Sequence, residues 1–137
     1  MRVGFSAFLC VFVLGCNSAS GHEAPTPEEA LVARGREVYK EQSCGVCHTL
    51  TDVGTGGVFG PPHDSVGTVA ARRIKDPAYK GAATTVDGYL RESIQNPTAF
   101  RVPGYEHTRF AMPAYTGLSP QDLDALVAML KTEKGRH

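Results

Sequence analysis

The sequence has no cysteine after Cys47 and only four cysteines among its 137 residues. A structural zinc site needs a second pair of ligands, so Cys44 and Cys47 lack the partners that such a site requires. Cys10 lies in an apolar N-terminal segment that we expect to be removed, and the other three cysteines have uses described below. We therefore expect no disulfide bond, although an exported protein could contain one.

The chain also lacks an excess of charge of either sign and a long apolar run. It has 14 Lys and Arg residues against 14 Asp and Glu residues. A nucleic-acid-binding surface is normally basic, so this balance gives no support for a nucleic-acid partner. The N-terminal apolar run, residues 4–15, is shorter than the roughly 18 residues that a membrane-spanning helix needs.

The most informative motif is Cys44-Gly45-Val46-Cys47-His48, which has the C-x-x-C-H spacing of covalent c-type haem attachment. Two thiols three positions apart on a helical turn share one face, where each can form a thioether with the same porphyrin. His48 follows directly, so its imidazole can take one axial position on the iron. A redox dithiol needs no adjacent histidine, which disfavours that alternative. The motif predicts one covalently bound haem c.

The first 15 residues have the features of a secretory signal: a positive charge at Arg2, a short apolar core and small residues before Cys16. The last four, Val13-Leu14-Gly15-Cys16, resemble the bacterial lipobox, whose cysteine is acylated; an ordinary signal peptide with an incidental cysteine is the alternative. The lipobox resemblance implies an exported protein anchored by lipid at Cys16 to a bacterial membrane, on its periplasmic side or at the cell surface. The expected division is a lipoprotein signal peptide at 1–15, a lipidated N-terminus and flexible tether at 16–25, and one domain at 26–137.

Three segments have the sequence signals of helices, and their expected ranges are 26–43, 84–96 and 119–135. Thr26 and Glu29 are spaced as a capping box, and Ser119 before a proline is a second strong helix start. Thr84 is the expected cap of the middle helix. Gly35 lowers the helix propensity of the first segment. Close approach of the last helix would explain its presence, and a tolerated glycine is the alternative.

The stretch between residues 51 and 62 is rich in Gly and Pro and cannot form a regular helix. A metal-bound histidine usually donates its second ring N–H to a carbonyl, and the carbonyl of Pro61 is our candidate partner for His48. A plain surface turn is the alternative. Further along, we expect His63 in a surface loop and the basic cluster within residues 72–75 on a solvated face. Arginine pairs well with carboxylates, so one arginine of this cluster, or Arg101, could instead meet a haem propionate.

Met112 is the candidate for the sixth iron position. Met1 is expected to be lost with the signal, and Met129 falls among the core positions of the last helix. A thioether is a soft ligand that suits haem iron and raises its reduction potential, and Pro113 would stiffen the loop. Ligation by His107 instead would give a bis-histidine haem of lower potential, and a vacant position would indicate gas binding or peroxide chemistry.

From residue 26 to residue 135 the order of these features resembles a class I, mitochondrial-type cytochrome c domain. Residues 88–97, followed by Pro103-Gly104-Tyr105 and Met112-Pro113, are similar to the cytochrome c domain fused to subunit II of some bacterial haem–copper oxidases. The resemblance implies a small all-α cytochrome c fold, in which three main helices and their loops surround one haem. It also implies the site residues: Cys44 and Cys47 as thioethers, His48 and Met112 as axial ligands, and Pro61 as the carbonyl partner of His48.

The expected function is single-electron transfer, without enzymatic activity or a small-molecule substrate. The expected partners are redox proteins, such as an oxidase, a reductase or a quinol-oxidising complex of a respiratory chain. The sequence has no second cysteine pair with histidines for a dicopper site, so we expect a stand-alone lipoprotein rather than the oxidase subunit itself. Two alternatives are a fixed haem relay in a larger membrane complex and a peroxidase-like or gas-sensing haem protein.

Overall fold

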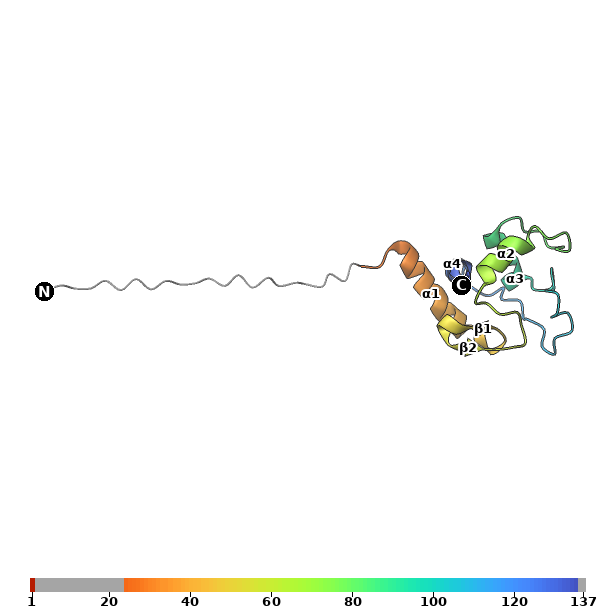
Figure 1. Ribbon diagram of the computed structural model, residues 1–137, viewed down its shortest axis with the longest axis horizontal. Coiled ribbons are helices and arrows are strands. Elements are labelled where there is room, and N and C mark those ends of the chain that lie inside the picture. Colours follow the sequence, from red (N-terminus) through yellow and green to blue (C-terminus); the bar gives the residue numbers. More distant parts are fainter. Residues whose placement is uncertain (2–23, 136–137) are drawn as a thin grey trace.

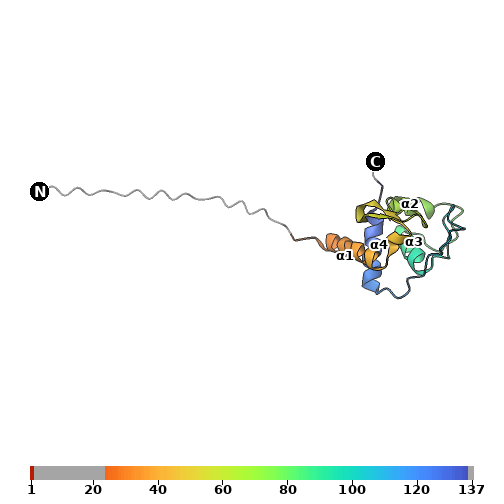
Figure 2. The ribbon, with the colours of Figure 1, turned by 90° about the horizontal axis from the view of Figure 1, so that it is seen from below.

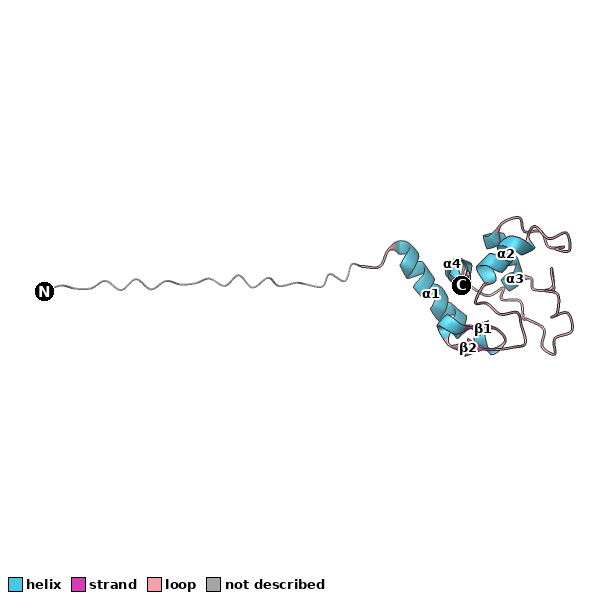
Figure 3. Cartoon of the chain, viewed as in Figure 1, coloured by secondary structure: helices cyan, strands magenta, loops and turns pink. Residues whose placement is uncertain are grey.

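The computed structural model describes Met1 and residues 24–135, so Cys16 and most of the expected signal segment lie outside the described residues. The described part is predominantly helical, with one pair of short antiparallel strands (Figures 1 and 3). Its elements are α1 (Pro27–Glu41), β1 (Thr49–Leu50), β2 (Thr55–Gly56), α2 (Val66–Arg73), α3 (Val86–Gln95) and α4 (Pro120–Thr132), with 3₁₀ turns at Cys44–Val46 and Thr51–Val53. The prediction of an all-α fold is confirmed, and a fourth helix, α2, is present beyond the three expected.

The helices begin where their capping side chains lie. The capping box of α1 is formed, because Thr26 Oγ1 accepts from the amide of Glu29 at 3.2 Å and the Glu29 carboxylate accepts from the amide of Thr26 at 2.8 Å. The hydroxyl of Ser119 caps α4 by accepting from the amide of Asp122 at 3.1 Å. The expected cap of the middle helix was wrong by one residue: the side chain that caps α3 belongs to Thr85.

Helix α4 is the element on which the other three helices pack, and it crosses α1 closely (Figure 2). A Cβ atom added at Gly35 of α1 would lie 2.2 Å from the carbonyl oxygen of Ala125 and 2.5 Å from Cβ of Met129. Only a residue without a side chain allows the two backbones to approach this far. The prediction that the last helix packs against the first near Gly35 is confirmed.

The core lies between these helices and is apolar. Met129 is fully buried in it, as expected from its position in the helical pattern. The other largest buried side chains are Val38, Tyr39, Leu50, Tyr89, Leu90, Ile94, Leu123, Leu126, Val127 and Leu130. No helix within residues 24–135 has both the length and the apolar character needed to cross a bilayer.

Candidate haem-attachment site

The end of α1 leads directly into the C-x-x-C-H motif. The helix ends at Glu41, and Ser43 takes a left-handed φ of 56° before the 3₁₀ turn that starts at Cys44. The amides of Cys47 and His48 both donate to the carbonyl of Cys44, at 3.2 Å and 3.1 Å. These bonds continue one helical turn through the motif, and its two thiols and its imidazole line the same pocket.

The His48 side chain is buried, with 6% of the residue exposed. Its Nδ1 donates to the carbonyl oxygen of Pro61 at 2.7 Å, which is the contact expected from the sequence. A carbonyl can only accept, so this bond places the imidazole hydrogen on Nδ1 and leaves Nε2 with a lone pair. Burial lowers the pKa of His48, against the opposing effect of the Pro61 bond, so the ring is neutral at pH 7, as an iron ligand must be.

Gly60 makes room for this imidazole. A Cβ atom at Gly60 would lie 2.3 Å from Cε1 of His48 and 2.7 Å from its Nδ1. The amide of Gly60 also donates to the carbonyl of Cys47 at 2.8 Å, which ties the Gly-Pro segment to the motif. The close approach of the Pro61 carbonyl to His48 therefore depends on a glycine at position 60.

The thiols of Cys44 and Cys47 are free and half-buried. Burial raises the pKa of the Cys44 thiol to about 11. Thiols that exchange disulfides have lowered pKa values, because the thiolate is the reactive form. The surroundings of Cys44 thus disfavour a redox dithiol.

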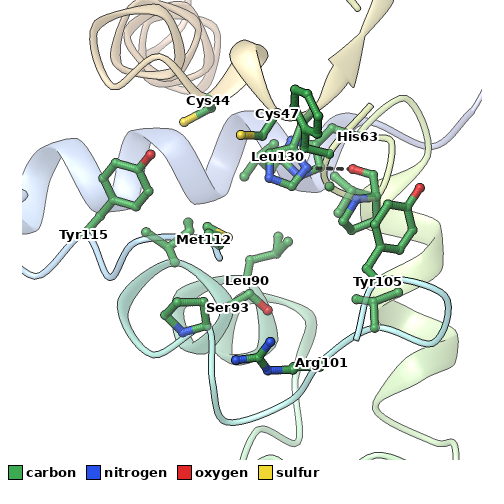
Figure 4. Close-up of a pocket in the computed structure, with 18 of the residues that line it drawn as sticks. Cys44, Cys47, His63, Leu90, Ser93, Arg101, Tyr105, Met112, Tyr115 and Leu130 are labelled. Carbon is green, nitrogen blue, oxygen red and sulfur yellow. Dashed lines mark hydrogen bonds between the residues drawn. The ribbon is translucent and has the colours of Figure 1, made fainter. Parts of the chain in front are cut away.

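Met112 lines the same pocket from the irregular segment between α3 and α4. Figure 4 shows Cys44, Cys47 and Met112 around one hollow, with Leu90 and Leu130 in its walls. The pocket walls are mainly apolar, with Tyr39, Ile94, Phe100 and Leu126 among the other lining residues. An iron atom placed there would be shielded from water.

Tyr115 holds the Met112 segment against the helices. Its amide donates to the carbonyl of Ile94 at 3.0 Å, and its hydroxyl donates to the carbonyl of Gln42 at 3.3 Å. His107, the alternative ligand, is exposed and is not among the residues that line the pocket. Of the two candidates for the sixth position, the structure therefore brings only Met112 to the pocket.

Two residues that the sequence placed in a surface loop or on a solvated face, His63 and Arg73, line the pocket, whereas Arg72 and Lys75 of the same basic cluster are exposed as expected. His63 stacks on the ring of His48, with ring centroids 3.9 Å apart and planes at 13°. Arg73, from the basic cluster, is partly buried and donates to the hydroxyl of Tyr89 at 2.7 Å. A polar residue in a Gly-Pro loop gives no local sign of burial, because its partners come from distant parts of the chain.

Comparison with known proteins agrees with this geometry. Residues 32–134 match the family model described as Cytochrome c. The chain belongs to the cytochrome c family. It is 32% identical over 113 residues to a cytochrome c oxidase subunit 2 of Alkalihalophilus pseudofirmus, a match that covers 82% of this chain and 28% of that protein. It is also 32% identical over 111 residues to a cytochrome c2 of Afifella marina, covering 74% of this chain and 82% of that protein.

No solved structure matches the chain significantly. Of the two relatives described above, the chain spans just over a quarter of the oxidase subunit and most of the length of the cytochrome c2. Proteins of the cytochrome c family carry electrons through a covalently bound haem c, and the side chains of the pocket fit that cofactor. The pocket offers two thiols at the required spacing, a buried neutral imidazole, a thioether and apolar walls.

Proposed function

We propose that the protein carries single electrons through an iron held between Nε2 of His48 and the thioether of Met112, with the haem attached through Cys44 and Cys47. The observation that carries this proposal is the pocket itself, which all four side chains line. The exposed position of His107 argues against bis-histidine ligation. The bound haem supplies an iron that alternates between the ferric and ferrous states.

The protein's own residues determine how that iron behaves. The Pro61 carbonyl fixes the tautomer and direction of His48, which makes the imidazole a better electron donor. Met112 is a soft ligand, and histidine–methionine ligation raises the reduction potential. Arg73 and Arg101 both line the pocket and are the candidates for pairing with the haem propionates.

The test is the optical spectrum of the holoprotein in its oxidised and reduced forms. Sulfur–ferric iron bonding produces a weak far-red band, which we expect in the wild type and in His107→Ala but not in Met112→Ala. A wild type that lacks the band and binds carbon monoxide readily when reduced has an open sixth position. That result would replace the simple carrier with a gas-reacting or peroxidase-like protein.

We further propose that residues 1–15 are a lipoprotein signal, that Cys16 is acylated, and that residues 26–137 form the exported domain on a bacterial membrane. The lipobox-like sequence supports the anchor, and the family match at 32–134 lies inside the proposed domain. Cys16→Ser should move the holoprotein from the membrane fraction to the soluble fraction. Retention of the variant in the membrane would contradict lipid anchoring.

For the partner, we propose a respiratory chain in which the protein passes electrons to a terminal oxidase or reductase. The similarity to a protein named cytochrome c oxidase subunit 2 supports this choice and also favours a second candidate, a fixed relay subunit of a larger complex. Mild detergent extraction followed by purification distinguishes them. Co-purification with an oxidase or a quinol-oxidising complex would favour the relay, whereas a lone haem lipoprotein would favour the carrier.

A further inference from the structure

One side chain of the pocket has no role in the function proposed above. His63 lies two residues after Pro61, and its ring is stacked almost parallel to that of His48, with centroids 3.9 Å apart and an interplanar angle of 13°. The Pro61 carbonyl contacts one edge of the His48 ring, at Nδ1, whereas His63 covers one of its faces. Figure 4 shows His63 at the margin of the pocket that Cys47 and Met112 border.

The His63 ring is itself held in place. Its Nδ1 is hydrogen-bonded to the hydroxyl of Tyr39 at 3.2 Å, and Tyr39 is a fully buried residue of α1. The rings of Tyr39 and His63 also meet edge to face, with centroids 5.7 Å apart and planes at 68°. The backbone of His63 is tied as well, because its amide donates to the carbonyl of Thr49 at 2.7 Å and its carbonyl accepts from the amide of Val66 at 3.0 Å.

The chemistry of this arrangement indicates more than space filling. An aliphatic side chain could fill the same volume without a buried polar edge, whereas an imidazole requires a hydrogen-bond partner there. Tyr39 supplies that partner, and its hydroxyl also lies 3.5 Å from the carbonyl oxygen of His48. Tyr39, His63 and His48 thus form a continuous chain of ring contacts from helix α1 to the imidazole that faces the pocket, edge to face between Tyr39 and His63 and stacked between His63 and His48.

The hydrogen bond to Pro61 holds the His48 ring at one edge of the imidazole plane, through Nδ1. A flat ring packed against that plane resists rotation strongly, because any turn would separate or overlap the two rings. We propose that His63, fixed by Tyr39, is a positioning residue that sets the plane of the His48 imidazole about its iron bond. This inference depends on the part of the proposed function in which His48 is an axial ligand.

The orientation of an axial imidazole has a direct readout. In a low-spin ferric haem it determines which iron orbital holds the unpaired electron, and so how unpaired spin is distributed over the porphyrin. Proton NMR of the oxidised protein reports this distribution as the order and spread of the four haem methyl shifts. Electron paramagnetic resonance reports it as the anisotropy of the g-values. A residue that only stabilised the fold would leave both unchanged.

The experiment compares three variants of the holoprotein with one control. His63→Leu removes the flat face and the polar edge, His63→Phe keeps a flat ring, and Tyr39→Phe removes only the hydroxyl that holds His63. His107→Leu is the control, because His107 is exposed and does not line the pocket. Urea unfolding of each protein gives the change in stability separately from the change in spectra.

We expect His63→Leu to reorder the methyl shifts and change the g-values, and His63→Phe to stay closer to the wild-type pattern. Tyr39→Phe should cause a smaller change in the same direction as His63→Leu, and the control should match the wild type. Wild-type methyl shifts and g-values in His63→Leu, with or without a loss of stability, would overturn the proposal. The proposal would also be overturned if Tyr39→Phe left the haem methyl shifts unchanged while His63→Phe altered them.

The far-red band is recorded in the same samples and tests the Met112 side alone. Its absence from the wild type would refute methionine ligation. Cyanide added to all samples would then fill the sixth position and keep the ferric haem low-spin, so the methyl shifts and g-values would still report the His48 plane. Conversely, an intact band with unchanged methyl shifts in His63→Leu would uphold the proposed ligands and refute the positioning role.

Discussion

Replacing Gly35 by alanine should destabilise the protein, although alanine is the better helix former. A Cβ atom at this position would lie 2.2 Å from the carbonyl oxygen of Ala125 and 2.9 Å from its carbonyl carbon. These are backbone atoms of α4, so no side-chain rotation can make room and the two helices must separate. The contact between α1 and α4 is the most extensive between helices in the described part of the chain, so the separation loosens the core.

The expected size follows from two opposing effects. Overpacking a core costs about 1–3 kcal/mol, and a clash with backbone belongs at the upper end of that range. The gain in helix propensity from Gly to Ala returns about 1 kcal/mol. The free energy of unfolding should therefore fall by about 2 kcal/mol, which corresponds to a decrease in Tm of about 8 °C for a domain of this size.

Urea unfolding of the oxidised holoprotein, followed by far-UV circular dichroism, measures this change. Gly88→Ala is the control: Gly88 is also helical, and its Cβ atom would meet nothing closer than the side-chain oxygen of Thr85 at 3.0 Å. We expect Gly88→Ala to be close to neutral. If Gly35→Ala were as stable as the wild type or more stable, α1 and α4 would not meet through backbone at Gly35 and the proposed packing would be wrong.

Three further predictions concern single contacts. Gly60→Ala should displace the His48 ring and lengthen its hydrogen bond to Pro61. We expect a lower yield of holoprotein and an altered optical spectrum. A normal yield with a wild-type spectrum would contradict the geometry at Gly60. Ser119→Ala removes the N-cap of α4 and should cost about 1 kcal/mol in urea unfolding, and no loss would mean that the cap is unimportant. Burial raises the pKa of Glu133, so its carboxyl group holds the proton more tightly in the folded protein than in the unfolded chain. The contribution of Glu133 to stability is therefore fully present below its ordinary pKa near 4.5 and is lost as the pH rises through the raised value. The stability of Glu133→Gln relative to the wild type should therefore increase as the pH rises from mildly acid to neutral. If the urea unfolding curves of the two proteins were the same at mildly acid pH and at neutral pH, this prediction would be refuted.

The parts of the structure that local sequence could predict are those held by local contacts. The capping box of α1 joins Thr26 to Glu29, three residues away, and the cap of α4 joins Ser119 to Asp122 at the same spacing. The C-x-x-C-H motif likewise forms its turn through bonds to the carbonyl of Cys44. In each case the residues that determine the conformation are adjacent in sequence, so pattern and structure agree.

Helix α2 was missed because its stability comes from elsewhere in the chain. Its first turn has no side-chain cap, and Gly67 is a poor helix former. The amide of Gly67 instead donates to the carbonyl of Glu133 at 2.8 Å, and Thr68 Oγ1 donates to that of Lys134 at 3.0 Å. A Cβ atom at Gly67 would lie 2.4 Å from the carbonyl oxygen of Lys131, so the glycine is required by the packing against the end of α4.

The contacts of His63, which is half-buried, were missed for a related reason. Its hydrogen-bond partner, Tyr39, is 24 residues away on another element, and its stacking partner is a residue of the motif. The correct cap of α3 could not be chosen from sequence because Thr84 and Thr85 are adjacent and equally suitable. Local pattern limits such a cap to one or two residues, whereas the long-range partners of a polar loop residue such as His63 can be identified only from the tertiary structure.

The two proposed axial ligands are supported unequally, which predicts the order in which they are lost. His48 is held by the Pro61 carbonyl, the His63 stack and the turn of its own motif. Met112 lies in an irregular segment of residues 96–119, where the described hydrogen bonds are mostly between near neighbours and Tyr115 makes the connections to the helices. Segments with few long-range contacts open at lower free energy than the core.

We therefore expect the far-red sulfur–iron band to disappear at a lower urea concentration than helical circular dichroism does. The substitution Tyr115→Phe removes the hydroxyl bond to Gln42, measured at 3.3 Å, while keeping the ring and the amide bond to Ile94. Loss of one such hydrogen bond costs about 1 kcal/mol, so the midpoint for the band should shift down while the global midpoint moves less. A band and a helical signal that disappear together in both proteins would mean that the Met112 segment unfolds only with the core, and that the unequal support has no effect on ligand release.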